Sequence, residues 1–251
     1  MSSPALRHRQ KVLAGKAGVQ NPRQAEQRGR PAAPPPPQPG GPANEYAALL
    51  AALHEDLRTL ADIQSHEQRV PRKAEMAAKY IDWIEGILAA DLPVQDEIVT
   101  TNMIWALDYR AFGFALDMAE FVLKHGLALP ERYSRTPACF LAEEIAELAL
   151  AQQEKVSHNL LLKIADMVEG YDMPDPVAAK LKKALGRSWM RKAADFDPAA
   201  ENAPAGGALA YVEQGLADLE RALVLDPQAG VKKDIQAAKA LQKKLAAAAA
   251  A

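Results

Sequence analysis

The chain has 251 residues and a formal net charge of −2 at pH 7, and 49% of its residues are hydrophobic while only 6% are aromatic. Abundant alanine favours helices over strands, because alanine is the best helix former and a poor strand former. The single cysteine, Cys139, excludes an internal disulfide and a zinc site built from cysteines. The start has no apolar run behind its basic residues, as a signal peptide would, and no stretch is long and apolar enough to span a membrane. We therefore expect a soluble all-α protein of a reducing cytosol.

Residues 1–43 are basic and rich in proline. They contain seven Lys or Arg residues against one acid, whereas residues 44–251 contain 23 basic and 31 acidic residues, a balance of −8. The run PAAPPPPQPGGP cannot form a helix, which predicts a disordered arm. Its first cations are Arg7, Arg9, Lys11 and Lys16. A basic arm on an acidic body fits a polyanion partner, and it is also typical of a solvated tail, so charge alone leaves both interpretations open.

A heptad-like pattern begins after the arm. Its members recur at spacings of 4, 3, 4 and 3 and are Tyr46, Leu50, Leu53, Leu57 and Leu60. This spacing predicts a helix with one narrow apolar seam. The seam either packs against the body of the same chain or joins neighbouring subunits, and the pattern does not decide between the two.

A series of short helices is predicted next. Apolar residues repeat at helical spacing through the stretch 95–137, where Gly126 occupies a position at which a helix C-terminus favours a left-handed residue. Thr136 and Pro137 are typical of an N-cap followed by proline in the first helical turn. Since short connections force consecutive helices to pack side by side, we expect residues 44–195 to form a multi-helix antiparallel bundle.

The C-terminal part has a different organisation. Residues 196–207 have the composition of a linker. Two helices are predicted over 208–245, and their sequence pattern, DLERALVLDP, is similar to that of tetratricopeptide hairpins. Lysines give this hairpin a basic edge: Lys232, Lys233, Lys239, Lys243 and Lys244. The sequence closes with a run of alanines, 246–251.

The sequence contains no motif for ATP hydrolysis or metal binding. It has no Gly-x-x-x-x-Gly-Lys-Ser/Thr loop, and its five histidines lack the spacing of metal ligands. Cys139 lies beside Phe140 and Leu141 near a predicted helix start, which indicates a buried structural thiol rather than a nucleophile. We expect no cofactor and no intrinsic catalysis.

Acidic residues leave one catalytic alternative open, a magnesium-dependent nuclease. Such a site needs two or more carboxylates that converge on a metal ion. Glu143, Glu144 and Glu147 lie within about one turn of a predicted helix and would be its residues, with Mg²⁺ as cofactor. No lysine in the chain has Asp or Glu two residues before it, so the Asp/Glu-x-Lys core of common nucleases is absent. A solvated helix face is the more ordinary interpretation.

A set of landmarks in a particular order and spacing extends over most of the chain: Ser3-Pro4-Ala5, Gln95-Asp96, Met103, Trp105, Leu107-Asp108, Ala115-Leu116, Gly126-Leu127, Pro130, Arg135-Thr136-Pro137, Glu143-Glu144, Asp172 to Asp175 and Ala229 to Lys233. In these landmarks the chain resembles the small terminase subunit of temperate, contractile-tailed double-stranded DNA phages, a family historically called the terminase endonuclease subunit. None of the landmarks is a catalytic motif.

The resemblance implies a role in DNA packaging. A protein of this kind binds the cos-type packaging site on viral double-stranded DNA, assembles as a homo-oligomeric ring and recruits the large subunit, which carries the ATPase and nuclease. It would act in the host bacterial cytoplasm, without a membrane partner and outside the mature virion. Two alternatives stay open: an endonuclease in its own right, and a helical adaptor that does not bind DNA.

The resemblance and the charge pattern together give the expected sites. DNA contacts are expected from the arm cations and from a second basic group formed by Arg69, Arg72 and Lys73. Oligomerisation is expected from the seam between Tyr46 and Leu60. Contact with the large subunit is expected from the C-terminal hairpin through Lys232 and Lys233.

Overall fold

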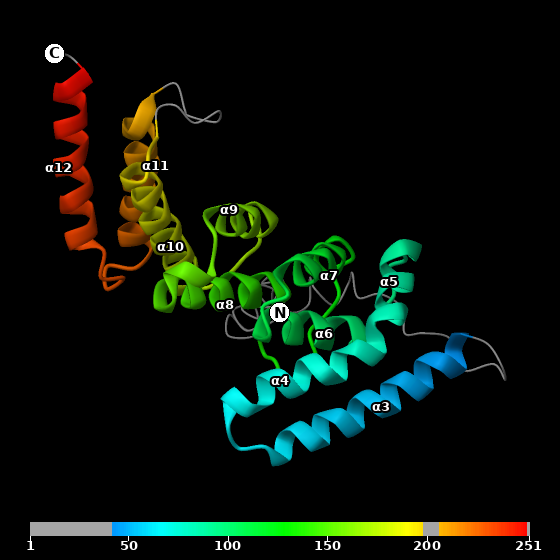
Figure 1. Ribbon diagram of the computed structural model, residues 1–251. Coiled ribbons are helices and arrows are strands. Elements are labelled where there is room, and N and C mark those ends of the chain that lie inside the picture. Colours follow the sequence, from blue (N-terminus) through cyan, green and yellow to red (C-terminus); the bar gives the residue numbers. More distant parts are fainter. Residues whose placement is uncertain (1–41, 198–205, 250–251) are drawn as a thin grey trace, which may run out of the picture. The chain divides into compact units, whose positions relative to one another are not determined.

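The computed structural model describes residues 42–197 and 206–249, and this part of the chain is all-helical, with no strand (Figure 1). Almost all of the predicted arm, with Arg7, Arg9, Lys11 and Lys16, therefore lies outside the described residues. So do most of the predicted linker and the last two alanines. Within the described ranges no helix is both long enough and apolar enough to cross a membrane.

The chain divides into two compact units, of which the first ends at Arg132 and the second begins at Tyr133. The boundary falls inside the segment 44–195 that the sequence predicts as one bundle. The two C-terminal helices belong to the second unit instead of standing apart, because the first of them packs along the helix that precedes the predicted linker.

Unit 1 consists of α3 (Pro42–Asp62), α4 (His66–Ala77), the short 3-10 helix η1 (Ala78–Tyr80), α5 (Ile81–Ala90), α6 (Glu97–Asp108) and α7 (Phe112–Lys124). The long helix α3 packs against α4 and α6, and α6 also packs against α4 and α7. Helix α6 is thus the centre of the unit. Gly126 after α7 adopts φ +63°, as its position in the sequence predicts.

Helix α6 is buried on every side, whereas its spacing predicts one buried face. Every residue from Ile98 to Leu107 is buried. Two of its polar side chains bond to their own helix: Thr100 Oγ1 donates to the carbonyl of Asp96 at 3.1 Å, and Asn102 Nδ2 donates to the carbonyl of Ile98 at 2.9 Å. Thr101 Oγ1 and Asn102 Oδ1 are buried without a hydrogen-bond partner in the described part of the chain. The two local bonds lower the cost of burying these polar groups, and the two unpartnered oxygens retain theirs.

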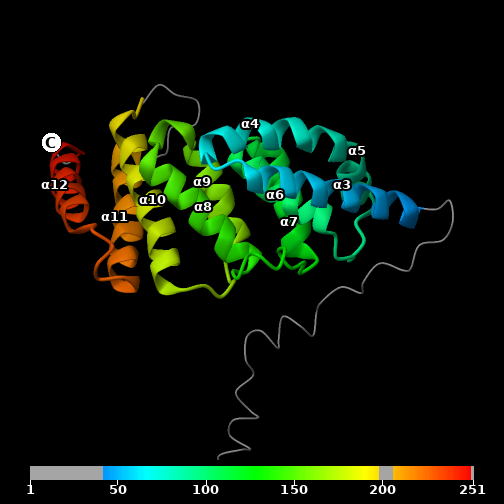
Figure 2. The ribbon, with the colours of Figure 1, turned by 90° about the horizontal axis from the view of Figure 1, so that it is seen from below.

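Unit 2 consists of α8 (Pro137–Ala151), the short 3-10 helix η2 (Gln153–Lys155), α9 (His158–Met167), α10 (Asp175–Ala194), α11 (Gly207–Leu225) and α12 (Lys232–Ala249). Helix α10 is central, because α8, α9 and α11 all pack against it. Helix α12 packs along α11 (Figure 2). Helix α8 begins as the sequence predicts, with Thr136 accepting a hydrogen bond from the amide of Cys139 and Pro137 in the first turn.

Candidate functional site: placement of the predicted residues and a basic helix face

The second basic group predicted to bind DNA lies on α4, and each of its members already has a partner in unit 1. Arg69 Nε donates to the carbonyl of Ile63 at 2.6 Å, which fixes the turn between α3 and α4. Arg72 pairs with Glu75 one turn further along the same helix at 2.7 Å.

Lys73 forms an ion pair with Asp108 of α6, in which the two side chains are only 13% and 19% exposed. A phosphate contact by Lys73 would therefore require it to leave a largely desolvated carboxylate. Of this group, only Arg72 projects a mostly exposed side chain into solvent.

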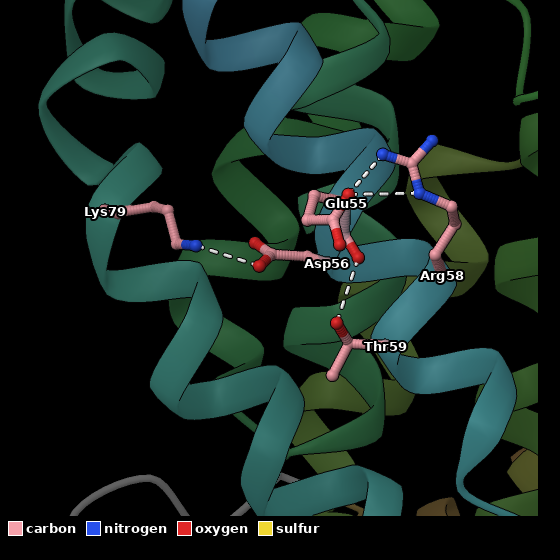
Figure 3. Close-up of polar contacts among 5 residues, drawn as sticks. All are labelled: Glu55, Asp56, Arg58, Thr59 and Lys79. Atoms are coloured by element: carbon pink, nitrogen blue, oxygen red, sulfur yellow. Dashed lines mark hydrogen bonds and ion pairs between the residues drawn. The ribbon is translucent and has the colours of Figure 1, made fainter.

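The structure also contains a buried carboxylate, that of Asp56, for which the sequence analysis makes no prediction. Asp56 of α3 is 7% exposed and accepts hydrogen bonds from Tyr80 Oη at 2.5 Å and from Lys79 Nζ at 2.8 Å. Figure 3 shows the Lys79 contact beside the outward-facing pair of Glu55 and Arg58. Burial, and then the hydrogen bond to Asp56, raise the pKa of Tyr80 far above its usual range. A sequence signal for Asp56 exists, because it lies three residues after Leu53 and therefore on the same helical stripe.

The predicted oligomerisation seam largely faces the body of its own unit. Leu53 and Leu60 are buried, while Leu50 and Leu57 are half-buried. Tyr46 lies against Trp83 of α5, with ring centroids 5.6 Å apart. Trp83 in turn donates to Asp96, the buried N-cap of α6, at 2.8 Å. Packing within the chain therefore accounts for the burial of Leu53 and Leu60, whereas Tyr46, Leu50 and Leu57 stay partly accessible.

The acidic cluster considered for a nuclease is held in ion pairs in unit 2. Glu143 of α8 is buried and pairs with Arg135 and with Lys180 of α10, the latter at 3.0 Å. Lys180 also pairs with Glu147, and its hydrogen bonds to Glu147 and Glu143 raise the pKa of Lys180. Glu144, between them, is half-buried. Two of the three carboxylates are therefore neutralised by lysine or arginine, as in a structural network.

No other metal site is evident: across residues 42–197 and 206–249, no three His, Cys, Asp or Glu side chains are grouped so that they could hold an ion. Cys139 is buried, and burial raises the pKa of its thiol. Both the burial and the pKa direction fit the structural thiol that the sequence predicts.

The lysines at the start of α12 are exposed. Lys232 and Lys233 have no ion-pair or hydrogen-bond partner among the residues that the structure describes, and the same holds for Lys243 and Lys244. Lys239 pairs with Glu220 of α11 at 2.8 Å. The only acid of α12, Asp234, bonds to Arg187 of α10 at 2.9 Å. One face of α12 is therefore cationic and free of acids.

Comparison with known proteins gives the family. A family model described as phage small terminase subunit matches residues 50–176. The protein named "Terminase, endonuclease subunit" of Escherichia phage P2 is 36% identical over 239 residues, which cover 94% of this chain and 84% of that protein. The chain belongs to the phage small terminase subunit family. No solved structure matches it.

This membership confirms the resemblance read from the sequence landmarks. The family-model match runs from α3 to the start of α10, so it covers nearly all of the described part of unit 1 and the first helices of unit 2. The basic helix α12 lies beyond that match.

Proposed function

We propose that this small terminase subunit binds viral double-stranded DNA at the cos-type packaging site, assembles as a homo-oligomeric ring and recruits the large ATPase–nuclease subunit. The observation that carries the proposal is the 36% identity to the phage P2 terminase subunit over 94% of the chain. The work of the protein would take place in the host cytoplasm, where the viral genome is cut and packaged.

The charge distribution supports the DNA-binding part. The arm carries seven cations in 43 residues, and α12 adds five lysines against one acid. Cations that neutralise phosphates release counterions, which makes such binding strongly dependent on salt. Phosphate contacts position a protein on DNA but carry no base information, so recognition of a packaging site needs further surface.

The experiment is a titration of a fluorescent duplex that carries the packaging site against the purified full chain at several NaCl concentrations. We expect an affinity that falls steeply as salt rises, and a higher affinity for this duplex than for a scrambled duplex of equal length. Equal binding to both duplexes would contradict site recognition. Absence of any salt-dependent binding would favour the adaptor alternative.

The name of the phage P2 relative favours a second candidate, an endonuclease in its own right. That function would need carboxylates free to bind Mg²⁺. The ion pairs of Glu143 and Glu147 weigh against these residues as metal ligands. Nicking of supercoiled plasmid by the purified chain with Mg²⁺, and its loss in Glu143→Gln/Glu144→Gln, would support this candidate over the proposal.

A further inference from the structure

The outer face of α12 carries a set of exposed lysines that membership of the family does not explain. All five of its lysines are exposed, and four of them are unpaired in the described part of the chain: Lys232, Lys233, Lys243 and Lys244. The opposite face carries the apolar residues that hold the helix on α11, including Ile235 and Ala238.

Helical geometry gathers these lysines on one side. Successive residues turn by about 100° and rise by about 1.5 Å, so the five lysines fall within an arc of about 140° and along about 18 Å of the axis. The arc is centred opposite the buried side of the helix. Between the lysines lie Gln236, Ala237 and Ala240, which are exposed, uncharged and no longer than the lysine side chains.

The cationic face contrasts with the chain that precedes it. Residues 44–231 contain 18 basic and 30 acidic residues, a balance of −12, whereas α12 contains five lysines and one aspartate. That aspartate, Asp234, bonds to Arg187 and lies at the flank of the helix, away from the lysine arc. The lysine face of α12 therefore contains no acidic residue of its own helix.

The chemistry of the face favours a nucleic-acid backbone over a protein surface. The centres of protein interfaces are enriched in aromatic residues, methionine and arginine and depleted in lysine, and this face offers only lysine, alanine and glutamine. Lysine is a compact charge that contacts phosphate without demanding a fixed geometry. A row of lysines about 18 Å long can lie along several phosphates of a duplex, which carries about one charge per 1.7 Å of its axis.

We propose that the lysine face of α12 binds the phosphate backbone of double-stranded DNA without reading bases. This inference rests on the proposed function and gives its DNA-binding activity a second surface besides the arm. It also assigns Lys232 and Lys233 to DNA, in place of the contact with the large subunit that the sequence predicts.

The test compares two pairs of substitutions in the full chain, each of which removes two positive charges. Lys243→Gln/Lys244→Gln alters the lysine face, and Lys155→Gln/Lys163→Gln alters exposed lysines elsewhere in unit 2. Binding to a duplex of about 30 base pairs of arbitrary sequence is measured by fluorescence anisotropy at increasing NaCl. Neither pair touches a buried side chain, and circular dichroism checks that both variants remain helical.

We expect the α12 pair to weaken binding at low salt by at least about tenfold. The slope of log Kobs against log salt, which is negative, should become shallower by about 1 to 2. The control pair should stay within about twofold of wild type with an unchanged slope. Adding Lys232→Gln/Lys233→Gln to the α12 pair should make the slope shallower still.

The outcomes separate this inference from the proposed function. If wild type binds DNA with a steep salt dependence and the α12 pair behaves like the control pair, the inference is overturned while the proposed function stands. If wild type shows no salt-dependent binding, the proposed function fails and the inference with it. If the α12 pair binds DNA normally but no longer captures the purified large subunit, the face is a protein contact and the inference is overturned.

Discussion

Gly186 of α10 and Gly215 of α11 lie directly against each other. A Cβ atom on Gly186 would come 2.9 Å from the carbonyl oxygen of Gly215, and one on Gly215 would come 3.1 Å from the carbonyl oxygen of Gly186. Helices approach this closely only where side chains are missing at the crossing. The contact explains why α11 joins α10 in one compact unit instead of forming a separate C-terminal module.

Substitution of Gly186 by alanine should destabilise unit 2. The new methyl group would lie 2.6 Å from Cγ of Leu219 as well as against the backbone of α11, so the helices must separate. Overpacking of this kind costs about 1–3 kcal/mol. Urea denaturation followed by circular dichroism should show the lower midpoint.

Gly86→Ala in α5 is the control for this prediction. Apart from its chain neighbours and the backbone of its own helix, no atom lies within 4 Å of a Cβ at Gly86, and the residue is exposed. Alanine there should be neutral or stabilising by up to about 1 kcal/mol, because glycine is a poor helix former. Equal effects of the two substitutions would contradict the close crossing of α10 and α11.

Removal of the Tyr80 hydroxyl, which bonds to Asp56 of α3, should lower the free energy of unfolding by more than removal of the exposed ion pair between Glu55 and Arg58 on the same helix. Tyr80→Phe takes one of two hydrogen-bond donors from the buried carboxylate of Asp56, and an unsatisfied buried acceptor costs about 1–3 kcal/mol. Arg58→Gln breaks the exposed pair with Glu55 and should cost about 0.5 kcal/mol or less. Urea midpoints measure both, and a Tyr80→Phe variant as stable as Arg58→Gln would show that Asp56 does not depend on the hydroxyl.

The stability of unit 2 should fall in mild acid because of His158. Its Nδ1 lies 2.9 Å from Ser188 Oγ, its Nε2 is buried without a partner in the described chain, and its ring lies against Trp189. Burial lowers the pKa of His158, and the nearby charges of Lys192 and Arg191 lower it further, against the opposing effect of Asp218.

The folded state therefore favours the neutral imidazole, and the contribution of His158 to stability is present above its ordinary pKa of about 6.5 and is lost as pH falls below it. Urea midpoints at pH 7.5 and pH 5.5 should differ less in His158→Gln than in wild type. His66→Gln removes an exposed histidine and should keep the wild-type difference. An unchanged difference in His158→Gln would assign the acid sensitivity to other groups.

Glu143→Gln should affect stability rather than DNA cleavage. The substitution leaves Arg135 and Lys180 without their buried carboxylate, and loss of a charged hydrogen-bond partner there costs about 1–3 kcal/mol. Glu147→Gln loses only an exposed pair with the same lysine and should cost less than about 1 kcal/mol. Any plasmid nicking with Mg²⁺ should be equal in wild type and both variants. Selective loss of nicking in Glu143→Gln at unchanged stability would instead mark Glu143 as a metal ligand.

Local sequence signals predicted local structure well. The cap formed by Thr136 and Pro137, the left-handed Gly126 and the burial of Cys139 all follow from the residues themselves and their immediate neighbours. The all-helical class follows from composition and periodicity in the same way.

Contacts between distant segments were beyond the reach of the sequence. The sequence predicts Lys73 as a DNA contact and gives no sign of its ion pair, because its partner Asp108 lies 35 residues away and is brought beside it only by the packing of α4 on α6. In the same way, Lys180 reaches Glu143 across 37 residues. Helical periodicity reports which side of a helix is apolar, and it contains no information about which charges the tertiary fold will pair.

Ring assembly and DNA binding are tested together by the solution mass of the purified chain in light scattering, with and without a duplex that carries the packaging site. A ring-forming, DNA-binding subunit should give a closed oligomer of many 27.1 kDa chains, and its mass should rise further when DNA is added. A monomer whose mass does not change with DNA would contradict both the ring and the DNA-binding role.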